Sequence, residues 1–252
     1  MKKLALILVC FCPSAWGAIA FDAASKAQTT AIFKNSFPAT VSWTHTVTGP
    51  NPFLSVEVTL QGTAGNAVSG ITYNSVAMTK SCSAGDGAVP FTEIWTLKAP
   101  ATGANTITAT ITGSGTEGGM IQAVSLSGVD QNTPVDVSTG GVLASATTVS
   151  LSTNTVKDQD WMVDSVYIFV NNTVTSTNGT ARVGFNDTGD IAVSTVSTRG
   201  PLTPAGSFSM GYTFGAASSS DYCIVAIMPV QAVAAAGGAS KIMKLRRYDE
   251  EW

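Results

Sequence analysis

The chain has 252 residues, of which 44% are hydrophobic and only 12% are charged, and its formal net charge is −3. This length suits one large domain or two small ones, and an all-β sandwich of this size forms a single domain in many proteins. A weakly acidic chain lacks the basic surface that recognises phosphate backbones, so nucleic-acid binding is set aside.

The first residues have the order of a secretory signal peptide. Lys2 and Lys3 precede an apolar run from Leu4 to Cys12, and small residues follow it. The run is too short to anchor a protein stably across a bilayer. We therefore predict a signal peptide over residues 1–18, a secreted or cell-surface protein, and no membrane span after cleavage.

Short segments with period-2 alternation follow throughout the chain, and a clear helical period is absent. The clearest strand runs from Val41 to Val47, and another from Leu54 to Leu60 places Glu57 on its polar, outward face. The remaining predicted strands are 19–21, 71–73, 76–78, 91–97, 106–112, 120–128, 149–151, 161–170, 181–185, 191–196, 208–214 and 222–230. The Asn74-Ser75 pair predicts a tight hairpin turn, although Asn-Gly would suit one better.

About a dozen short strands with frequent turns predict an all-β protein, a single large antiparallel β-sandwich over residues 19–231. The segments 18–129 and 130–230 can also be read as two halves, but no proline-rich or charged linker separates them. Residues 232–252 form an Ala/Gly linker and a charged tail ending in KIMKLRRYDEEW. The tail is read as frayed, with a docking peptide as the alternative.

Two cysteines, Cys82 and Cys223, remain after the signal peptide. An oxidising compartment would allow them to form a disulfide that closes a long loop. Cys82 lies in a Ser/Gly loop and Cys223 in an apolar strand, so the sequence leaves their pairing open.

Residues for catalysis are sparse. The one histidine, His45, lies on the apolar face of its predicted strand, which favours a core role over a proton relay. The two strand-borne glutamates, Glu57 and Glu93, are predicted on different faces, whereas a glycosidase needs two carboxylates in one groove. We therefore predict a protein that is not an enzyme.

Binding residues are easier to nominate. Glu93 and Trp95 share one strand face and are the candidate ligand-binding pair, and Trp43, Trp95 and Trp161 are the aromatic residues that could stack on a sugar or fill the core. Calcium is the candidate cofactor, because loop oxygens suit it. Its candidate ligands are Asp187 and Asp190, with the pair Asp158 and Asp160 as the other acidic site.

Several segments in order resemble a recurrent module of secreted bacterial surface proteins and phage virion-associated proteins. They are SWTHTV, LSVEVTLQG, ITYNSVAMTK, EIWTLKAPATGANTITATITG and AVSLSGVDQNTPVD, spanning about Val41 to Asp136. The resemblance implies an Ig-like or jelly-roll sandwich with a display, adhesion or structural role, and it carries no catalytic residue.

The leading hypothesis is a non-enzymatic exported β-sandwich that acts as an adhesin-like or virion-associated module with a surface glycan or protein partner. One alternative is a carbohydrate-binding, lectin-like module assisted by calcium. The other is a self-assembling filament subunit, in which the segment after the signal peptide donates a strand to a neighbour.

Overall fold

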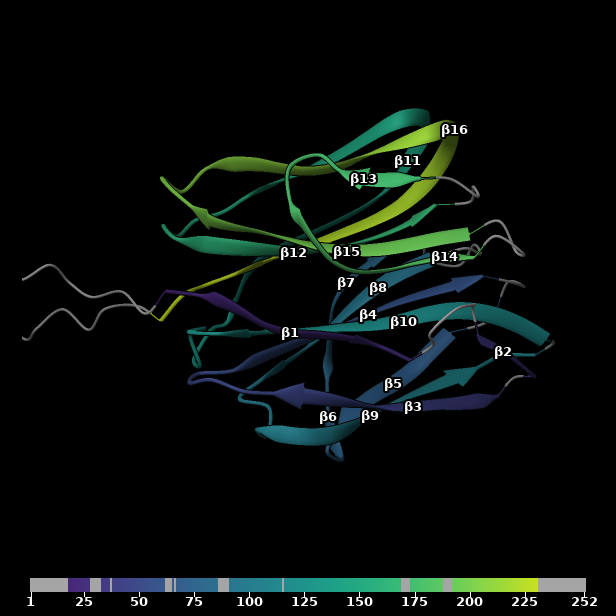
Figure 1. Ribbon diagram of the computed structural model, residues 1–252, viewed down its shortest axis with the longest axis horizontal. Helices are drawn as coiled ribbons and strands as arrows, with labels where there is room; N and C mark the ends of the chain where they lie inside the picture. The colour runs from purple at the N-terminus through teal and green to yellow at the C-terminus, as the bar shows by residue number, and fades with distance from the viewer. Residues whose placement is uncertain are drawn as a thin grey trace, which may run out of the picture.

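The computed structural model describes residues 18–27, 33–36, 38–61, 65, 67–85, 91–114, 116–168, 173–187 and 192–230. These residues form sixteen strands in three antiparallel sheets, with no helix among them (Figure 1). The described part of the chain thus has no helix of the length and hydropathy that crossing a membrane requires. The all-β, antiparallel prediction is confirmed, but the strands are more numerous than the predicted dozen and form three sheets rather than the two of a simple sandwich.

The sheets are named here by their place in the fold. The middle sheet contains β1 (Ala20–Lys26), β2 (Phe33–Ser36), β4 (Phe53–Gln61), β7 (Thr79–Ala84), β8 (Phe91–Lys98) and β10 (Thr116–Ser127). The four-stranded sheet contains β3 (Ala39–Val47), β5 (Ala67–Tyr73), β6 (Val76–Ala77) and β9 (Gly103–Thr112). The folded sheet contains β11 (Val135–Asn154), β12 (Asp160–Ile168), β13 (Val174–Ser176), β14 (Thr180–Asp187), β15 (Ala192–Leu202) and β16 (Ser207–Ile227).

The middle sheet is covered on both faces, by the four-stranded sheet below and the folded sheet above in Figure 1. Along β4, Val56 and Val58 pack towards the four-stranded sheet, whereas Phe53 packs towards the folded sheet. Glu57 also lies between the middle and folded sheets, with no solvent exposure. The prediction that Glu57 faces outward is therefore wrong, because a second sheet covers the polar face of its strand.

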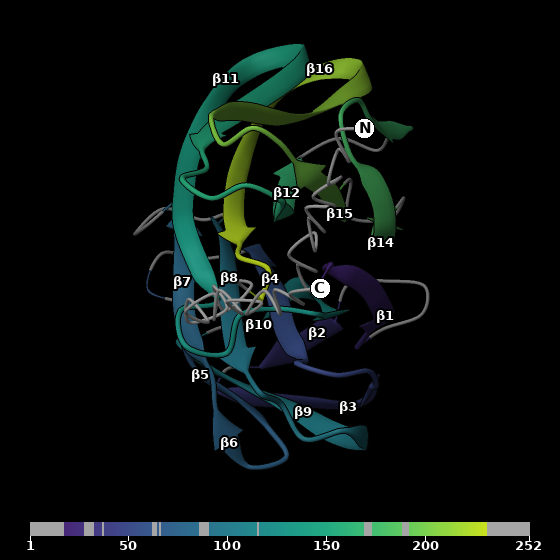
Figure 2. The same cartoon turned by 90° about the vertical axis from the view of Figure 1, so that its left-hand side faces the viewer.

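The folded sheet bends back on itself and encloses a core of its own. Strands β11 and β16 pair along most of their length, with register shifts where they arch over the top of the molecule in Figure 2. Asp164 of β12 lies within this core and accepts hydrogen bonds from Tyr212 and Tyr222 at 2.8 and 2.7 Å. The two tyrosines lie on opposite sides of the bend in β16, so hydrogen bonds to the one carboxyl group connect the two parts of the bent strand.

The sheets divide the chain at the boundary between the two halves. The middle and four-stranded sheets use residues up to Ser127, and the folded sheet uses residues from Val135 onward. The halves are nevertheless joined by a shared apolar core and by the Cys82–Cys223 disulfide, which links β7 to β16 with Cα atoms 5.9 Å apart. Gly140 of β11 passes beside it, where a Cβ would meet Ser83 O at 2.4 Å.

Two local features bear on the sequence predictions. Asn74 and Ser75 both have positive φ, 48° and 64°, as a two-residue type I′ hairpin turn requires.

At the N-terminal end, β1 and β2 pair with β10 of their own sheet. The described strands of the segment that the filament hypothesis assigns to a neighbouring subunit, β1 and β2, thus belong to this chain's own middle sheet.

Candidate functional site

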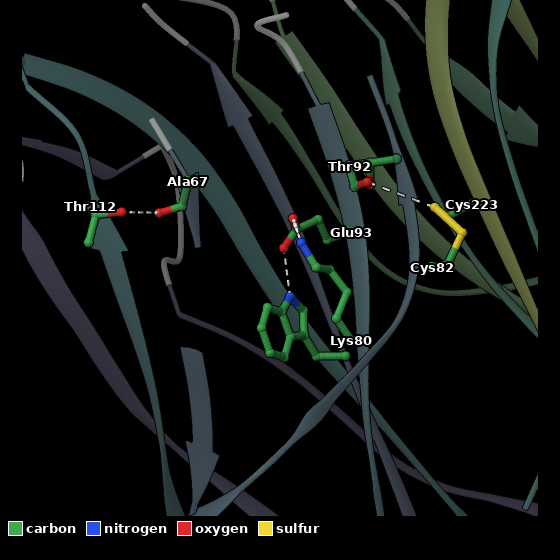
Figure 3. A network of polar contacts seen from close by, with 8 residues as sticks. Ala67, Lys80, Cys82, Thr92, Glu93, Thr112 and Cys223 are labelled. Atoms are coloured by element: carbon green, nitrogen blue, oxygen red, sulfur yellow. Dashed lines mark hydrogen bonds and ion pairs between the residues drawn. A yellow bond between two sulfur atoms is a disulfide. The ribbon is translucent and has the colours of Figure 1, made fainter. Parts of the chain in front are cut away.

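Glu93 and Trp95, the predicted ligand-binding pair, lie side by side on β8 and are both buried. Glu93 Oε2 accepts a hydrogen bond from the Trp95 indole at 2.7 Å, and Oε1 pairs with Lys80 Nζ at 2.7 Å (Figure 3). Trp95 also contributes to the core between the middle sheet and the four-stranded sheet. Since each carboxylate oxygen already has a partner and Trp95 as a whole is 8% exposed, the pair offers a ligand little surface.

His45 stands at the centre of a hydrogen-bonded chain between β1, β3 and β10. Its Nδ1 lies 2.7 Å from Ser25 Oγ, and Ser25 Oγ accepts a hydrogen bond from the Trp43 indole at 3.0 Å. Its Nε2 lies 3.1 Å from Ser125 Oγ, which donates to Asp22 Oδ2 at 2.7 Å. These hydrogen bonds are consistent with a neutral imidazole that donates through Nε2 and accepts at Nδ1. This is the arrangement of a satisfied core histidine.

Burial of His45 makes stability depend on acidity. Burial lowers its pKa from 6.5 to about 4, against the charge of Asp22, so the unfolded chain binds the proton more readily. The contribution of neutral His45 to the free energy of unfolding is complete above pH 6.5 and is lost as the pH falls towards 4. Glutamine does not titrate. Between pH 7 and pH 4.5 we therefore expect the free energy of unfolding of His45→Gln, measured with urea, to fall by about 2 kcal/mol less than that of the wild type. Equal losses in the two proteins would contradict this assignment.

The calcium candidates do not converge on one site in the described residues. Asp187 ends β14, but its side chain is not described, and Asp190 lies outside the described residues. Asp158 is exposed and accepts a hydrogen bond from the Ala205 amide at 2.6 Å, whereas Asp160 is buried. In the described ranges no three His, Cys, Asp or Glu residues are placed to hold a metal ion together.

A groove of about 290 Å³ lies at one end of the folded sheet, where β12, β14 and β15 meet. Its lining residues are polar or small except for one aromatic residue, and they are Trp161, Asn178, Gly179, Thr180, Arg182, Thr198, Arg199 and Gly200. The half-buried indole of Trp161 lies against Gly200, where a Cβ would come within 2.3 Å of the ring. Any side chain larger than glycine at that position would displace the indole.

The two arginines of the groove are held in place by neighbouring groups. Arg182 donates from Nε to Thr198 Oγ1 at 2.7 Å, and its guanidinium carbon lies 4.1 Å from the Phe21 ring centroid. Arg199 donates to the Ser209 carbonyl, and its guanidinium lies 5.4 Å from the Phe208 ring centroid. Burial lowers the pKa of Arg182, but an arginine remains protonated at neutral pH.

The groove is cationic in a protein of net negative charge. Of the four arginines in the chain, Arg246 and Arg247 lie in the tail, and the other two both line the groove. No acidic side chain is among its lining residues. Rigid guanidinium groups beside an aromatic ring can bind a carboxylate or sulfate while the ring packs on an apolar ligand face.

No family model, no curated protein and no solved structure matches this chain. The site must therefore be interpreted from its own chemistry.

The residues of the groove were not predicted as a group from the sequence. Trp161 was among the candidate aromatic residues, but neither Arg182 nor Arg199 was nominated. The sequence did offer one signal, because arginine is rare in this chain and both residues fall within strands of the folded sheet. Their proximity depends on the pairing of β14 with β15, in which Thr180 lies opposite Thr198.

Proposed function

We propose that this protein is an exported, non-enzymatic β-sandwich module that binds an acidic glycan in the Trp161 groove, at a cell surface or on a virion. The observation that carries the proposal is that Arg182, Arg199 and Trp161 line the same groove, with both arginine side chains held by hydrogen bonds. A sugar ring presents an apolar face to an aromatic side chain, and its carboxylate or sulfate would meet Arg182 and Arg199. The groove volume, about 290 Å³, lies near the lower end of small-ligand sites and favours one sugar unit of a longer chain.

Export supports this function. The signal-like N-terminus predicts it, and a disulfide between Cys82 and Cys223 is compatible with an extracellular location. The low charge density and the extensive β structure also suit a module displayed outside the cell. The resemblance to bacterial surface and virion modules implies the same setting.

The test compares binding of charged and neutral oligosaccharides by titration calorimetry. We expect sialyllactose or oligogalacturonate to bind, and lactose to bind at least tenfold more weakly. Arg182→Gln should lower the affinity for the charged sugar at least tenfold, because a hydrogen bond to a charged group contributes about 1.5–3 kcal/mol. Lys98→Gln removes one positive charge from an exposed position on β8 and is the matched control.

Two results would contradict the proposal. One is indistinguishable binding of charged and neutral sugars by the wild type. The other is an equal loss of affinity in Arg182→Gln and Lys98→Gln, since that would indicate a non-specific charge effect. Thermal unfolding of each variant shows whether a loss of binding reflects a loss of structure, because Arg182 also contacts Phe21.

A further inference from the structure

The described chain ends close to the groove. Strand β16 ends at Ile227, which lies opposite Trp161 in the pairing of β12 with β16. Figure 1 shows the yellow end of β16 and the start of β12 at the same end of the folded sheet. Opposite residues of antiparallel strands lie about 5 Å apart, and three further residues add about 10 Å at most. The Cα atom of Val230, the last described residue, therefore lies within about 15 Å of that of Trp161.

A second set of contacts places Val230 near Arg182. The Val230 amide donates to Gly128 O at 3.0 Å, and a Cβ on Gly128 would meet Ala18 O at 2.2 Å. Phe21 follows Ala18 closely in the chain, and its ring centroid lies 4.1 Å from the Arg182 guanidinium carbon. The described chain thus ends near two residues of the groove, by routes that run through different strands.

Residues 231–252 have the length and the charge to return to the groove. The Ala/Gly linker 232–240 can extend to about 30 Å, which is more than the distance to the groove requires. Four basic residues follow the linker, and after them comes the acidic stretch 249–251, Asp249-Glu250-Glu251. This stretch is thus tethered close to a groove that two arginines and no acidic residue line.

The basic residues of the tail have partners of their own on the fold, so they need not neutralise the acidic stretch. Three aspartates with some solvent exposure lie at the same end of the fold as Val230. They are Asp130, whose amide donates to Met228 O at 2.9 Å, Asp136, next to the β11 residue that pairs with Ile227, and Asp158, in the turn before β12. The basic residues come first in the tail and can pair with these aspartates, which leaves the later acidic stretch for the arginines.

We propose that the acidic stretch 249–251 binds in the Trp161 groove of its own chain, with its carboxylates against Arg182 and Arg199. Carboxylates and guanidinium groups form strong, charge-assisted hydrogen bonds. A tethered segment competes for its site at an effective concentration in the millimolar range, so even a weak contact is populated. The proposal does not depend on glycan binding, but an acidic ligand would have to displace the tail from the groove.

The experiment attaches a nitroxide spin label to Tyr248→Cys in the full chain and records the indole N–H signals by NMR. We expect the Trp161 signal to lose about half or more of its intensity, because a segment at millimolar effective concentration spends much of its time in the groove. Trp95 packs on the far face of the middle sheet, so its indole signal is the internal control and should persist. In 1 M NaCl, where the Debye length is about 3 Å, the Trp161 signal should recover.

Two variants of the labelled chain test which charges are responsible. Replacing the acidic stretch as Asp249→Asn, Glu250→Gln and Glu251→Gln should restore the Trp161 signal, and these changes lie outside the described fold. Arg182→Gln should also restore it, whereas Lys98→Gln, which removes a positive charge from an exposed position on β8, should leave it broadened. Because the tail variant does not touch the folded sheet, it remains informative if Arg182→Gln fails to fold.

Three outcomes would overturn the proposal. A Trp161 signal of full intensity in the labelled chain would show that the tail stays away from the groove. Equal broadening with and without the acidic side chains would show proximity without recognition. Broadening that appears when spin-labelled and isotope-labelled chains are mixed would assign the groove to the tail of a second copy. None of these measurements uses a sugar, so each result is independent of glycan binding.

Discussion

Replacing Cys82 and Cys223 together with alanine should lower the free energy of unfolding by about 3–5 kcal/mol. The disulfide joins residues 141 positions apart, and closing a loop of that length restricts the unfolded chain strongly in the chain-entropy model. It also joins the middle sheet to the folded sheet inside their shared core. Because the two halves of the chain form separate sheets, it is the one covalent link between them besides the polypeptide itself within the described residues.

Urea unfolding of the variant and of the wild type, with and without reductant, measures this loss. Cys223 is fully buried, so reduction requires unfolding, and the reduced sample must be refolded in the presence of reductant. The reduced wild type keeps both sulfur atoms and lacks only the bond between them. Because the bond supplies most of the stabilisation, the free energy of unfolding of the reduced wild type should fall nearly as much as that of the double variant. A loss below about 1 kcal/mol in both proteins would mean that the noncovalent contacts between the sheets suffice.

Glu57→Gln should stabilise the protein at pH 8 and have little effect at pH 5. Glu57 has no solvent exposure, Ser55 donates to its Oε1, and its Oε2 accepts no hydrogen bond from the described residues. Burial raises its pKa from 4.5 to about 8, and the nearby charge of Asp164 adds to the shift, against the hydrogen bond from Ser55. At neutral pH the buried side chain is therefore largely protonated.

The sign of the pH dependence follows from that shift. Between pH 4.5 and 8 the folded protein binds more protons at Glu57 than the unfolded chain does, so stability falls as the pH rises through this window. Glu57→Gln keeps the shape and removes the titration. We expect its free energy of unfolding to fall by about 2–4 kcal/mol less than that of the wild type between pH 5 and pH 8.

Glu93→Gln is the matched control for Glu57→Gln. Glu93 lies on the neighbouring strand β8, is also buried, and is paired with Lys80 and Trp95. Its replacement should lower stability at both pH values, because Lys80 loses its carboxylate partner. Identical slopes of stability against pH in the wild type and in Glu57→Gln would contradict the assignment of a protonated Glu57.

Parity within a strand was predictable from the sequence where turns were clear. Glu93 and Trp95 share a face, while Ile94 packs on the opposite side of the middle sheet. The strand from Val41 to Val47 was also found with nearly its predicted bounds, as β3. The alternation of side chains along a strand depends on residues that are close in the sequence, so it can be read from a short segment.

Strand length was harder to predict. The segments 208–214 and 222–230 were read as two strands, but most of their residues belong to the single bent strand β16. Small and polar residues between Phe214 and Tyr222 resemble a loop in composition, whereas pairing with β11 keeps part of that segment in the sheet. Cross-strand hydrogen bonding outweighed local preference there.

The all-β class, most strand positions and the side chains that share a strand face could be predicted from local sequence patterns. What covers each face depends on how the sheets stack, which those patterns do not contain. The polar alternation of Ser55, Glu57 and Thr59 is the same whether water or another sheet lies opposite, because period-2 alternation reports direction and not surroundings. For the same reason, the presence of Arg182 and Trp161 in one groove depends on sheet order and register, which act between residues far apart in the chain.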